Sequence, residues 1–158
     1  MSKLQSQRTR FELKAIFGLL LAIILTGAVA GASSAATESA PRSRALHLTK
    51  ECSQYTGLAD SFCTITSSNV GAITVGSRVV YFQAAGATSL DSDIVLLVGP
   101  GDYALGHVTL DFATGTGKVT IWGGTGRFAS FHAKVAVSAL GGPDWAWDGR
   151  YRFGRDKD

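Results

Sequence analysis

The sequence predicts an all-β domain, either a sandwich or a barrel. After residue 36, apolar and polar residues alternate in seven or eight short runs, and none of these runs repeats with the period of a helix. Glycine-rich turns separate the runs about every 8–12 residues, a spacing that is typical of sandwiches and barrels. The alternation gives each strand one solvated face, which favours a closed antiparallel barrel.

The N-terminal residues 1–36 have the three parts of a secretory signal peptide. Basic residues come first, an uncharged apolar run follows from Ala15, and small residues end the segment. A-x-A-like cleavage sites lie within residues 30–36, and we favour cleavage after Ala36. The alternative is an uncleaved membrane anchor, because residues 15–36 are long enough to span a bilayer. We therefore expect a secreted, extracellular or periplasmic protein, which contacts a membrane only if this segment is retained.

The charge balance does not indicate nucleic acid as a partner. The chain has 15 Lys and Arg against 12 Asp and Glu, but residues 1–36 hold four of the bases and one of the acids. The rest of the chain therefore has 11 bases and 11 acids, and its bases do not cluster in the sequence. Behind the signal peptide we expect a flexible leader at residues 37–44, the barrel domain at residues 45–154 and a polar tail at residues 155–158.

Two cysteines, Cys52 and Cys63, are predicted to form a disulfide, because an even cysteine count in an exported chain indicates pairing. Closing a loop this short stabilises a fold by ~3 kcal/mol in the chain-entropy treatment. The two thiols supply at most half a zinc site, and the three histidines show no metal-type spacing. We therefore predict a structural disulfide, no metal and no other cofactor.

The first half of the domain is predicted to contain four strands, at residues 45–52, 62–66, 78–83 and 94–98. Residues 54–61 are expected to form a loop beneath the disulfide. Residues 69–77 and 84–93 are rich in glycine and polar residues, so turns are expected there. The run Ile94–Val98 is continuously apolar, which predicts a strand that is buried on both faces or wedged in a tight barrel.

The second half is predicted to contain four more strands, at residues 103–112, 118–122, 130–137 and 145–153. In the last one, an aromatic face carries Trp145, Trp147, Tyr151 and Phe153, and a polar face carries Asp148, Arg150 and Arg152. Gly149 interrupts the aromatic row, where a missing side chain suggests a bend or a close approach. We expect this row to be core, with part of it facing a ligand. The candidate ligand-binding residues are Tyr81, Trp145, Trp147 and Tyr151.

Two glycine motifs match nucleotide-binding loops without indicating a nucleotide site. They are Gly124-x-Gly126-x-x-Ala129 and Gly99-x-Gly101-x-x-Ala104. The fingerprint works through a following helix whose amino end faces a pyrophosphate, and strands are predicted here instead. The chain contains no G-x-S-x-G nucleophile elbow. His107 and His132 fall on the polar faces of their strands, so we expect surface residues and assign no catalytic residue.

One segment resembles a known family. It is Gly123-Gly124-Thr125-Gly126-Arg127-Phe128, preceded by a strand that ends in Trp122 and followed by Phe131-His132-Ala133-Lys134-Val135. It resembles the G-G-[ST]-G-x-F hairpin of the allene oxide cyclase and dirigent barrel superfamily, matching it at Gly123, Gly124, Gly126 and Phe128. Asp102-Tyr103-x-x-Gly106-His107 is similar to the preceding strand of those barrels. The closing run 145–153 and residues 52–85 are similar to small secreted bacterial proteins assigned to the same barrel, so the resemblance covers about residues 50–153. We expect the hexapeptide to form a tight hairpin turn.

The resemblance implies an eight-stranded antiparallel barrel with a central cavity. Plant members of the superfamily steer the coupling of phenoxy radicals or cyclise a fatty-acid epoxide with the help of a lumen Glu. Glu38 and Glu51 are the glutamates after the signal peptide, and no motif equates either with that acid. We therefore expect a secreted, non-catalytic barrel that binds a small apolar ligand. The alternatives are an isomerase or cyclase, with Glu51, His107, His132 or Tyr81 as its ionisable group, and an envelope or host-interaction scaffold.

Overall fold

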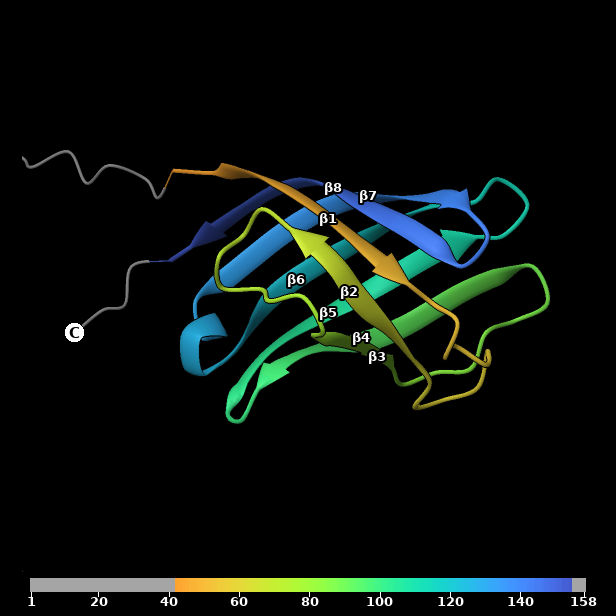
Figure 1. Cartoon of the computed structure of the whole chain (residues 1–158), viewed down its shortest axis with the longest axis horizontal. Helices are drawn as coiled ribbons and strands as arrows, with labels where there is room; N and C mark the ends of the chain where they lie inside the picture. The colour runs from red at the N-terminus through yellow and green to blue at the C-terminus, as the bar shows by residue number, and fades with distance from the viewer. Residues whose placement is uncertain (1–41, 155–158) are drawn as a thin grey trace, which may run out of the picture. The chain divides into compact units, whose positions relative to one another are not determined.

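The computed structural model describes residues 42–154, and in this range the chain forms a closed antiparallel barrel of eight strands (Figure 1). Each strand pairs with the next one along the chain, and β8 pairs with β1 to close the sheet. The predicted all-β class and antiparallel barrel are confirmed. The predicted signal peptide, the leader as far as residue 41 and the tail at residues 155–158 lie outside the described residues. In the described range, no helix is long and apolar enough to cross a membrane.

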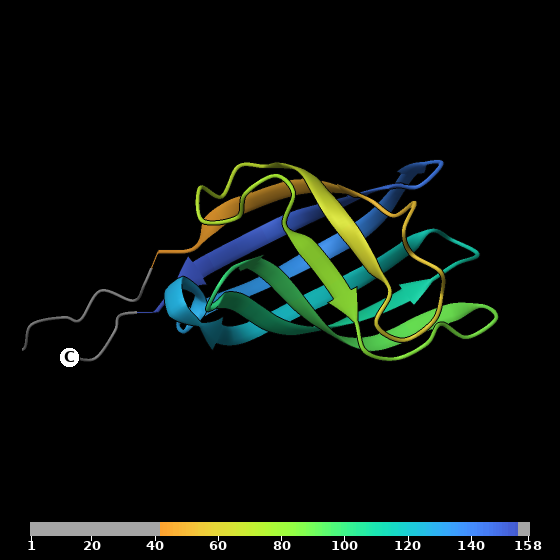
Figure 2. The same cartoon turned by 60° about the horizontal axis from the view of Figure 1, so that its bottom comes forward.

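The strands differ in length, and the two shortest are neighbours. The elements are β1 Arg44–Glu51, β2 Phe62–Ser68, β3 Arg78–Tyr81, β4 Ser89–Gly99, β5 Asp102–Asp111, β6 Thr116–Thr125, the 3-10 helix η1 Gly126–Phe128, β7 Phe131–Gly141 and β8 Asp144–Phe153. β2 has 7 residues and β3 has 4, and long connections flank both strands (Figure 2). The predicted disulfide between Cys52 and Cys63 is confirmed, with an S–S distance of 2.06 Å. It ties β2 to the end of β1, on the side where the barrel wall has the fewest backbone pairs.

β4 begins earlier than predicted, and its apolar run is buried on both faces only around Val95, which is 8% exposed on the outer face. It starts at Ser89 rather than at Ile94, so the turn predicted over residues 84–93 is wrong in its second half. Ser92 faces the core at 0% exposure because its hydroxyl hydrogen-bonds backbone groups at 3.1 and 2.7 Å. A serine whose hydrogen bonds are satisfied can occupy an inward position among apolar side chains. Its polar side chain interrupts the apolar alternation, so the sequence pattern did not indicate a strand here. On the outer face Leu97 is 42% exposed.

The segment Gly123–Phe128 is not itself the turn that the sequence predicted. Its first three residues extend β6 and pair with the start of β5, and the chain turns in η1 and the two residues after it. Gly124 is required for close packing, because a Cβ there would lie 2.8 Å from the Ala104 Cα. Gly126 begins the turn in the left-handed region, with a φ of +53°. Phe128 then enters the barrel and is fully buried.

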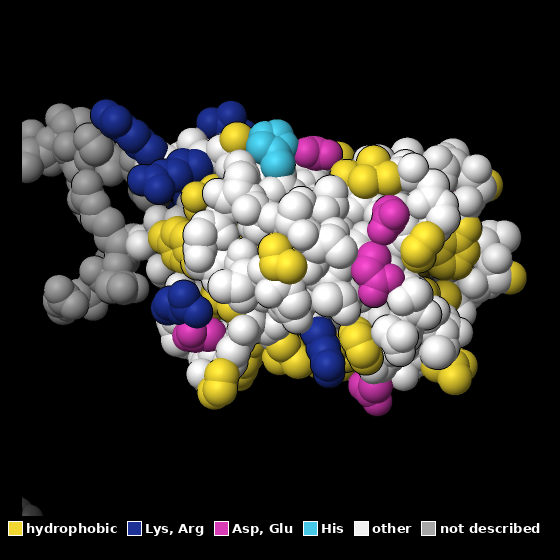
Figure 3. All heavy atoms as spheres, viewed as in Figure 1, with side chains coloured by type: hydrophobic (Ala, Val, Ile, Leu, Met, Phe, Trp, Pro, Cys, Tyr) yellow, Lys and Arg dark blue, Asp and Glu magenta, His cyan; other side chains and the backbone are white. Residues whose placement is uncertain are grey.

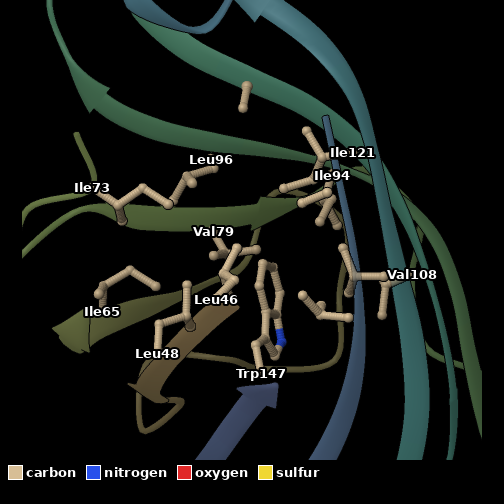
Figure 4. Close-up of a cluster of buried hydrophobic side chains, with 14 of the residues drawn as sticks. Leu46, Leu48, Ile65, Ile73, Val79, Ile94, Leu96, Val108, Ile121 and Trp147 are labelled. Atoms are coloured by element: carbon tan, nitrogen blue, oxygen red, sulfur yellow. The ribbon is translucent and has the colours of Figure 1, made fainter. Parts of the chain in front are cut away.

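Side chains from every strand fill the barrel interior, as is expected for eight strands. Figure 4 shows part of this core, in which Leu46, Leu48, Ile65, Ile73, Val79, Ile94, Leu96, Val108, Ile121 and Trp147 are labelled. The strand alternation predicted for β8 is confirmed, since Trp147 and Tyr151 are buried while Arg150 and Arg152 are exposed. The close approach predicted at Gly149 is also confirmed, because a Cβ there would lie 2.7 Å from the Val135 Cα of β7.

The two ends of the barrel differ in chemistry. At the end where β8 finishes, Phe131 packs against Phe128 and Phe153, with ring centroids 5.3 and 4.9 Å away. At the end where β8 begins, the interior holds Lys50 and Tyr81 beside the disulfide. The first end is an apolar plug, and the second is the part of the lumen that carries polar groups suited to binding.

Candidate functional site

Lys50 faces the barrel interior near the end where β8 begins. It continues the inward row of β1 that Leu46 and Leu48 start, so strand alternation carries it into the core. Lys50 is only 4% exposed, and it pairs with Trp145 of β8 across the β1–β8 ladder. Sequence reasoning missed this residue, although the Leu-x-Leu-x-Lys spacing of a half-buried strand contains the signal.

Phenol, sulfur and indole groups surround the Lys50 amine. Its Nζ lies 2.6 Å from the Tyr81 Oη, and 3.4 and 3.5 Å from the two sulfur atoms of the disulfide. The ring centroids of Trp145 and Trp147 lie 5.8 and 5.7 Å from Nζ, within the range of a cation–π interaction. The site therefore presents one amine and one phenol against a soft, largely apolar wall.

Burial without a carboxylate partner determines the charge of this lysine. No salt bridge within residues 42–154 includes Lys50. Desolvation lowers the pKa of Lys50 from 10.5 to about 7, so at pH 7 about half of the amine is neutral. Burial, helped by the neighbouring Tyr55, raises the pKa of Tyr81, and its phenol stays protonated. The phenol can therefore donate to the neutral amine or accept from the ammonium.

Two further polar atoms at this end of the barrel are buried without a hydrogen-bond partner in the described residues. They are the Tyr55 Oη and the Trp147 Nε1. The Tyr55 ring packs edge-on against Tyr81 at 5.0 Å, and the Trp147 indole borders Lys50. A buried donor without a partner costs about 1–3 kcal/mol, so a water molecule or a ligand atom that accepted a hydrogen bond from either group would be stabilised there.

The disulfide loop, residues 52–61, borders this site. Backbone hydrogen bonds fix it at three places: Cys52 N to Pro143 O at 2.9 Å, Asp60 N to Tyr81 O at 2.7 Å, and Ala85 N to Gly57 O at 2.8 Å. The loop carries Tyr55 inward, while Leu58 near its tip is 66% exposed. The residues next to the amine are thus held by the loop as well as by the strands.

The structure brings together three of the four predicted ligand-binding residues. Tyr81, Trp145 and Trp147 surround Lys50. Tyr151 is separated from them, because it lies toward the other end of β8, with its ring centroid 5.7 Å from that of Phe131. Strand alternation places Trp145, Trp147 and Tyr151 on the same inward face of β8, so it does not distinguish them. Their positions along the barrel axis differ, and Tyr151 lies away from the other two.

The other ionisable candidates lie outside the lumen. Glu51 is partly exposed on the outer face of β1, and hydrogen bonds from Ser53 lower its pKa. His107 points outward between two aspartates, at 2.9 and 3.0 Å, and His132 lies on the outer face of β7. Of the four residues proposed for a cyclase, Tyr81 alone faces the interior. Within the described part of the chain, no group of three or more His, Cys, Asp or Glu side chains is placed to hold a metal ion.

Comparisons with family models, with curated proteins and with solved structures found no match for this chain. The fold and the site therefore define the class of protein by themselves. It is a closed eight-stranded antiparallel barrel that encloses, near one end, a lysine with no carboxylate partner among residues 42–154.

Proposed function

We propose that this protein is a secreted, non-catalytic barrel of the allene oxide cyclase and dirigent type, which binds a small and mostly apolar ligand at the Lys50 end. The observation that carries the proposal is the buried amine itself. It hydrogen-bonds Tyr81 and has no carboxylate partner among the described residues. An ammonium in such surroundings gains most from an anionic or carbonyl oxygen.

The walls of the site indicate the rest of the ligand. Trp145, Trp147 and the disulfide offer an apolar surface, and the Trp147 Nε1 and Tyr55 Oη offer two more donors. A planar or short-chain acid with one carboxylate matches this arrangement of one cation and few donors in an apolar site. Because side chains fill the middle of the barrel, the ligand takes the end beside Lys50, where the loop at residues 52–61 borders the amine.

The disulfide supports export, since such bridges persist in oxidising compartments. The signal peptide predicted at residues 1–36 gives the route. A protein that leaves the cell with one apolar site has the properties of a carrier or scavenger of small molecules.

An isomerase is the second candidate, and the contact between Lys50 and Tyr81 favours it. An amine with a pKa of about 7, at 2.6 Å from a phenol, can act as a general base near neutral pH. Turnover of a bound epoxide or enone by the wild type, and its loss in Lys50→Met, would establish this candidate over simple binding.

Calorimetric titration with cinnamate, and with cinnamyl alcohol as the neutral counterpart, tests the binding proposal. We expect the wild type to prefer the acid by about tenfold, which corresponds to one charge-assisted hydrogen bond. Lys50→Met and Tyr81→Phe should remove this preference. Tyr151→Phe, which changes a tyrosine toward the other end of the barrel, is the matched control and should keep it. A wild type that binds neither compound, or an unchanged preference in Lys50→Met, would contradict the proposal.

A further inference from the structure

The outer face of β7 and β8 carries two consecutive pairs of basic residues. Lys134 lies directly opposite Arg150, and His132 lies directly opposite Arg152. Side chains at directly opposite positions have their Cβ atoms about 4.5–5.5 Å apart, and like charges in such pairs destabilise a sheet. The fold therefore keeps four basic side chains together on one face, where a sheet under selection for stability alone would alternate their signs.

No acid in the described residues neutralises this group. The salt bridges in residues 42–154 involve His47, His107 and Arg127, and none involves Lys134, Arg150 or Arg152. Asp148 is the acid next along β8, and its carboxylate is 2.7 Å from the His47 Nδ1 instead. Figure 3, viewed with β1 and β2 in front, shows further Lys and Arg side chains toward the end of the barrel where β1 begins and β8 finishes. The chain is neutral after its signal segment, but this face is not.

The basic group lines a groove on the outside of β6, β7 and β8. The groove has a volume of about 430 Å³, and its lining includes Ser43, Trp122, His132, Lys134, Arg150 and Arg152. Trp122 is 49% exposed, which is unusual for the largest apolar side chain. Arg150 is oriented by Ser43, since its Nε donates to the Oγ and its Nη2 to the backbone oxygen, both at 3.1 Å. The guanidinium has five N–H donors, so several stay available to a ligand.

We propose that this groove binds an acidic polysaccharide. A sugar ring stacks on the exposed Trp122 indole, and carboxylate or sulfate groups of the polymer bind Lys134, Arg150 and Arg152. Neighbouring strands lie about 4.8 Å apart, and alternate residues of one strand lie about 6.7 Å apart. The cations on β7 and β8 are therefore spaced regularly along the sheet surface, and they can bind successive charged groups of a polymer. Arginine and lysine suit oxyanions, and the fork of Arg150 is already held in place.

Two other anionic partners fit the groove less well. Single-stranded nucleic acid is bound by stacking successive bases on several aromatic residues, and the groove has one tryptophan in its lining. A flat anionic membrane attracts basic residues, but it cannot fill a concave groove of about 430 Å³. The site faces outward and shares no residue with the Lys50 site in the lumen. Either proposal can therefore fail while the other holds.

Binding to immobilised heparin and polygalacturonate, with neutral dextran as the uncharged polymer, tests the inference. We expect the wild type to bind both acidic polymers and not dextran, with an affinity that falls as salt is raised. Arg152→Gln and Lys134→Gln should each weaken binding by about tenfold, and Trp122→Ala by about fivefold. Lys118→Gln is the matched control, because it removes one charge from the outer face of β6 outside this groove, and it should change affinity by less than about twofold.

Thermal unfolding separates loss of the site from loss of the fold. Removing Lys134 relieves its repulsion with Arg150, and removing Arg152 takes away an exposed charge that has no salt bridge in the described residues, so these variants should unfold at the wild-type temperature or above it while they bind more weakly. The proposal is overturned if the wild type binds neither acidic polysaccharide. It is also overturned if phosphatidylglycerol vesicles or a single-stranded oligonucleotide bind more tightly than both polymers, or if Lys118→Gln weakens binding as much as Arg152→Gln.

Discussion

Replacing Lys50 by methionine should change how the stability of the barrel depends on pH. The pKa of Lys50 is 10.5 in the unfolded chain and about 7 in the folded barrel, because burial disfavours the ammonium. Between these two values the unfolded chain binds more protons than the folded one, so the free energy of unfolding rises with pH. The full penalty of the buried ammonium, below pH 7, is about 5 kcal/mol.

Most of this penalty is relieved within an accessible pH range. From pH 7 to pH 9.5 the two pKa values give a gain of about 3 kcal/mol in the free energy of unfolding. From pH 5 to pH 7 the gain is only about 0.4 kcal/mol, since the lysine is mainly protonated in both states. Tyr81 limits the window, because burial raises the pKa of its phenol and stability falls again above about pH 10. The wild type should therefore be most stable between about pH 9 and pH 10.

Urea unfolding at pH 5, 7, 8 and 9.5, with the disulfide intact, measures this curve. The wild type should gain about 3 kcal/mol between pH 7 and pH 9.5, and Lys50→Met should gain almost nothing. Lys118→Gln, which removes an exposed lysine, should keep the wild-type rise. A flat wild-type curve, or the same rise in Lys50→Met, would refute the assignment of Lys50 as a buried amine with a lowered pKa.

Three further predictions test the fold. Replacing both Cys52 and Cys63 by alanine should lower the free energy of unfolding by about 2–5 kcal/mol in urea, and a loss below about 1 kcal/mol would show that the bridge does not brace the short strands. Trp147→Ala should cost about 3–5 kcal/mol in the same assay because it leaves a cavity in the core, and an unchanged midpoint would contradict its burial at 1% exposure. Gly149→Ala should cost at least about 2 kcal/mol, since a Cβ would meet the β7 backbone. Gly71→Ala, with nothing within 4 Å of its Cβ, should change stability by less than about 0.5 kcal/mol in parallel measurements; equal effects at the two glycines would disprove the close approach.

Strand alternation made most of the barrel predictable. In β8 it separates the buried Trp147 and Tyr151 from the exposed Arg150 and Arg152, and the structure agrees residue by residue. The same rule failed at β4, because Ser92 occupies an inward position with its hydroxyl satisfied by backbone groups. Strand prediction from periodicity requires inward positions to be apolar and outward positions to be polar. A small polar residue that faces inward, with its hydrogen bonds made to nearby backbone groups, breaks that pattern.

The candidate site was predicted in part. The aromatic residues Trp145 and Trp147 were recognised as possible ligand contacts, and Tyr81 with them. Lys50 was not, because lysine is almost never fully buried and was not considered as part of an inward row. Tyr151 was grouped with the others because alternation gives the face of a residue but not its depth along the barrel. Depth depends on strand register, which the sequence does not state.

Register also explains why the basic face escaped notice in the sequence. His132 was placed on the polar face of one strand, and Arg150 and Arg152 on that of another, but nothing in the sequence sets the two faces opposite each other. The β7–β8 pairing does so, and it places the like charges of Lys134 and Arg150 opposite each other where a single shift of two residues would put Lys134 opposite Asp148. The fold thus tolerates an avoidable repulsion on its surface and an uncompensated amine in its core. Sequences that specify one structure keep destabilising arrangements of this kind mainly where function requires them. The Lys50 site and the basic groove each contain one, so they are the two sites to test first.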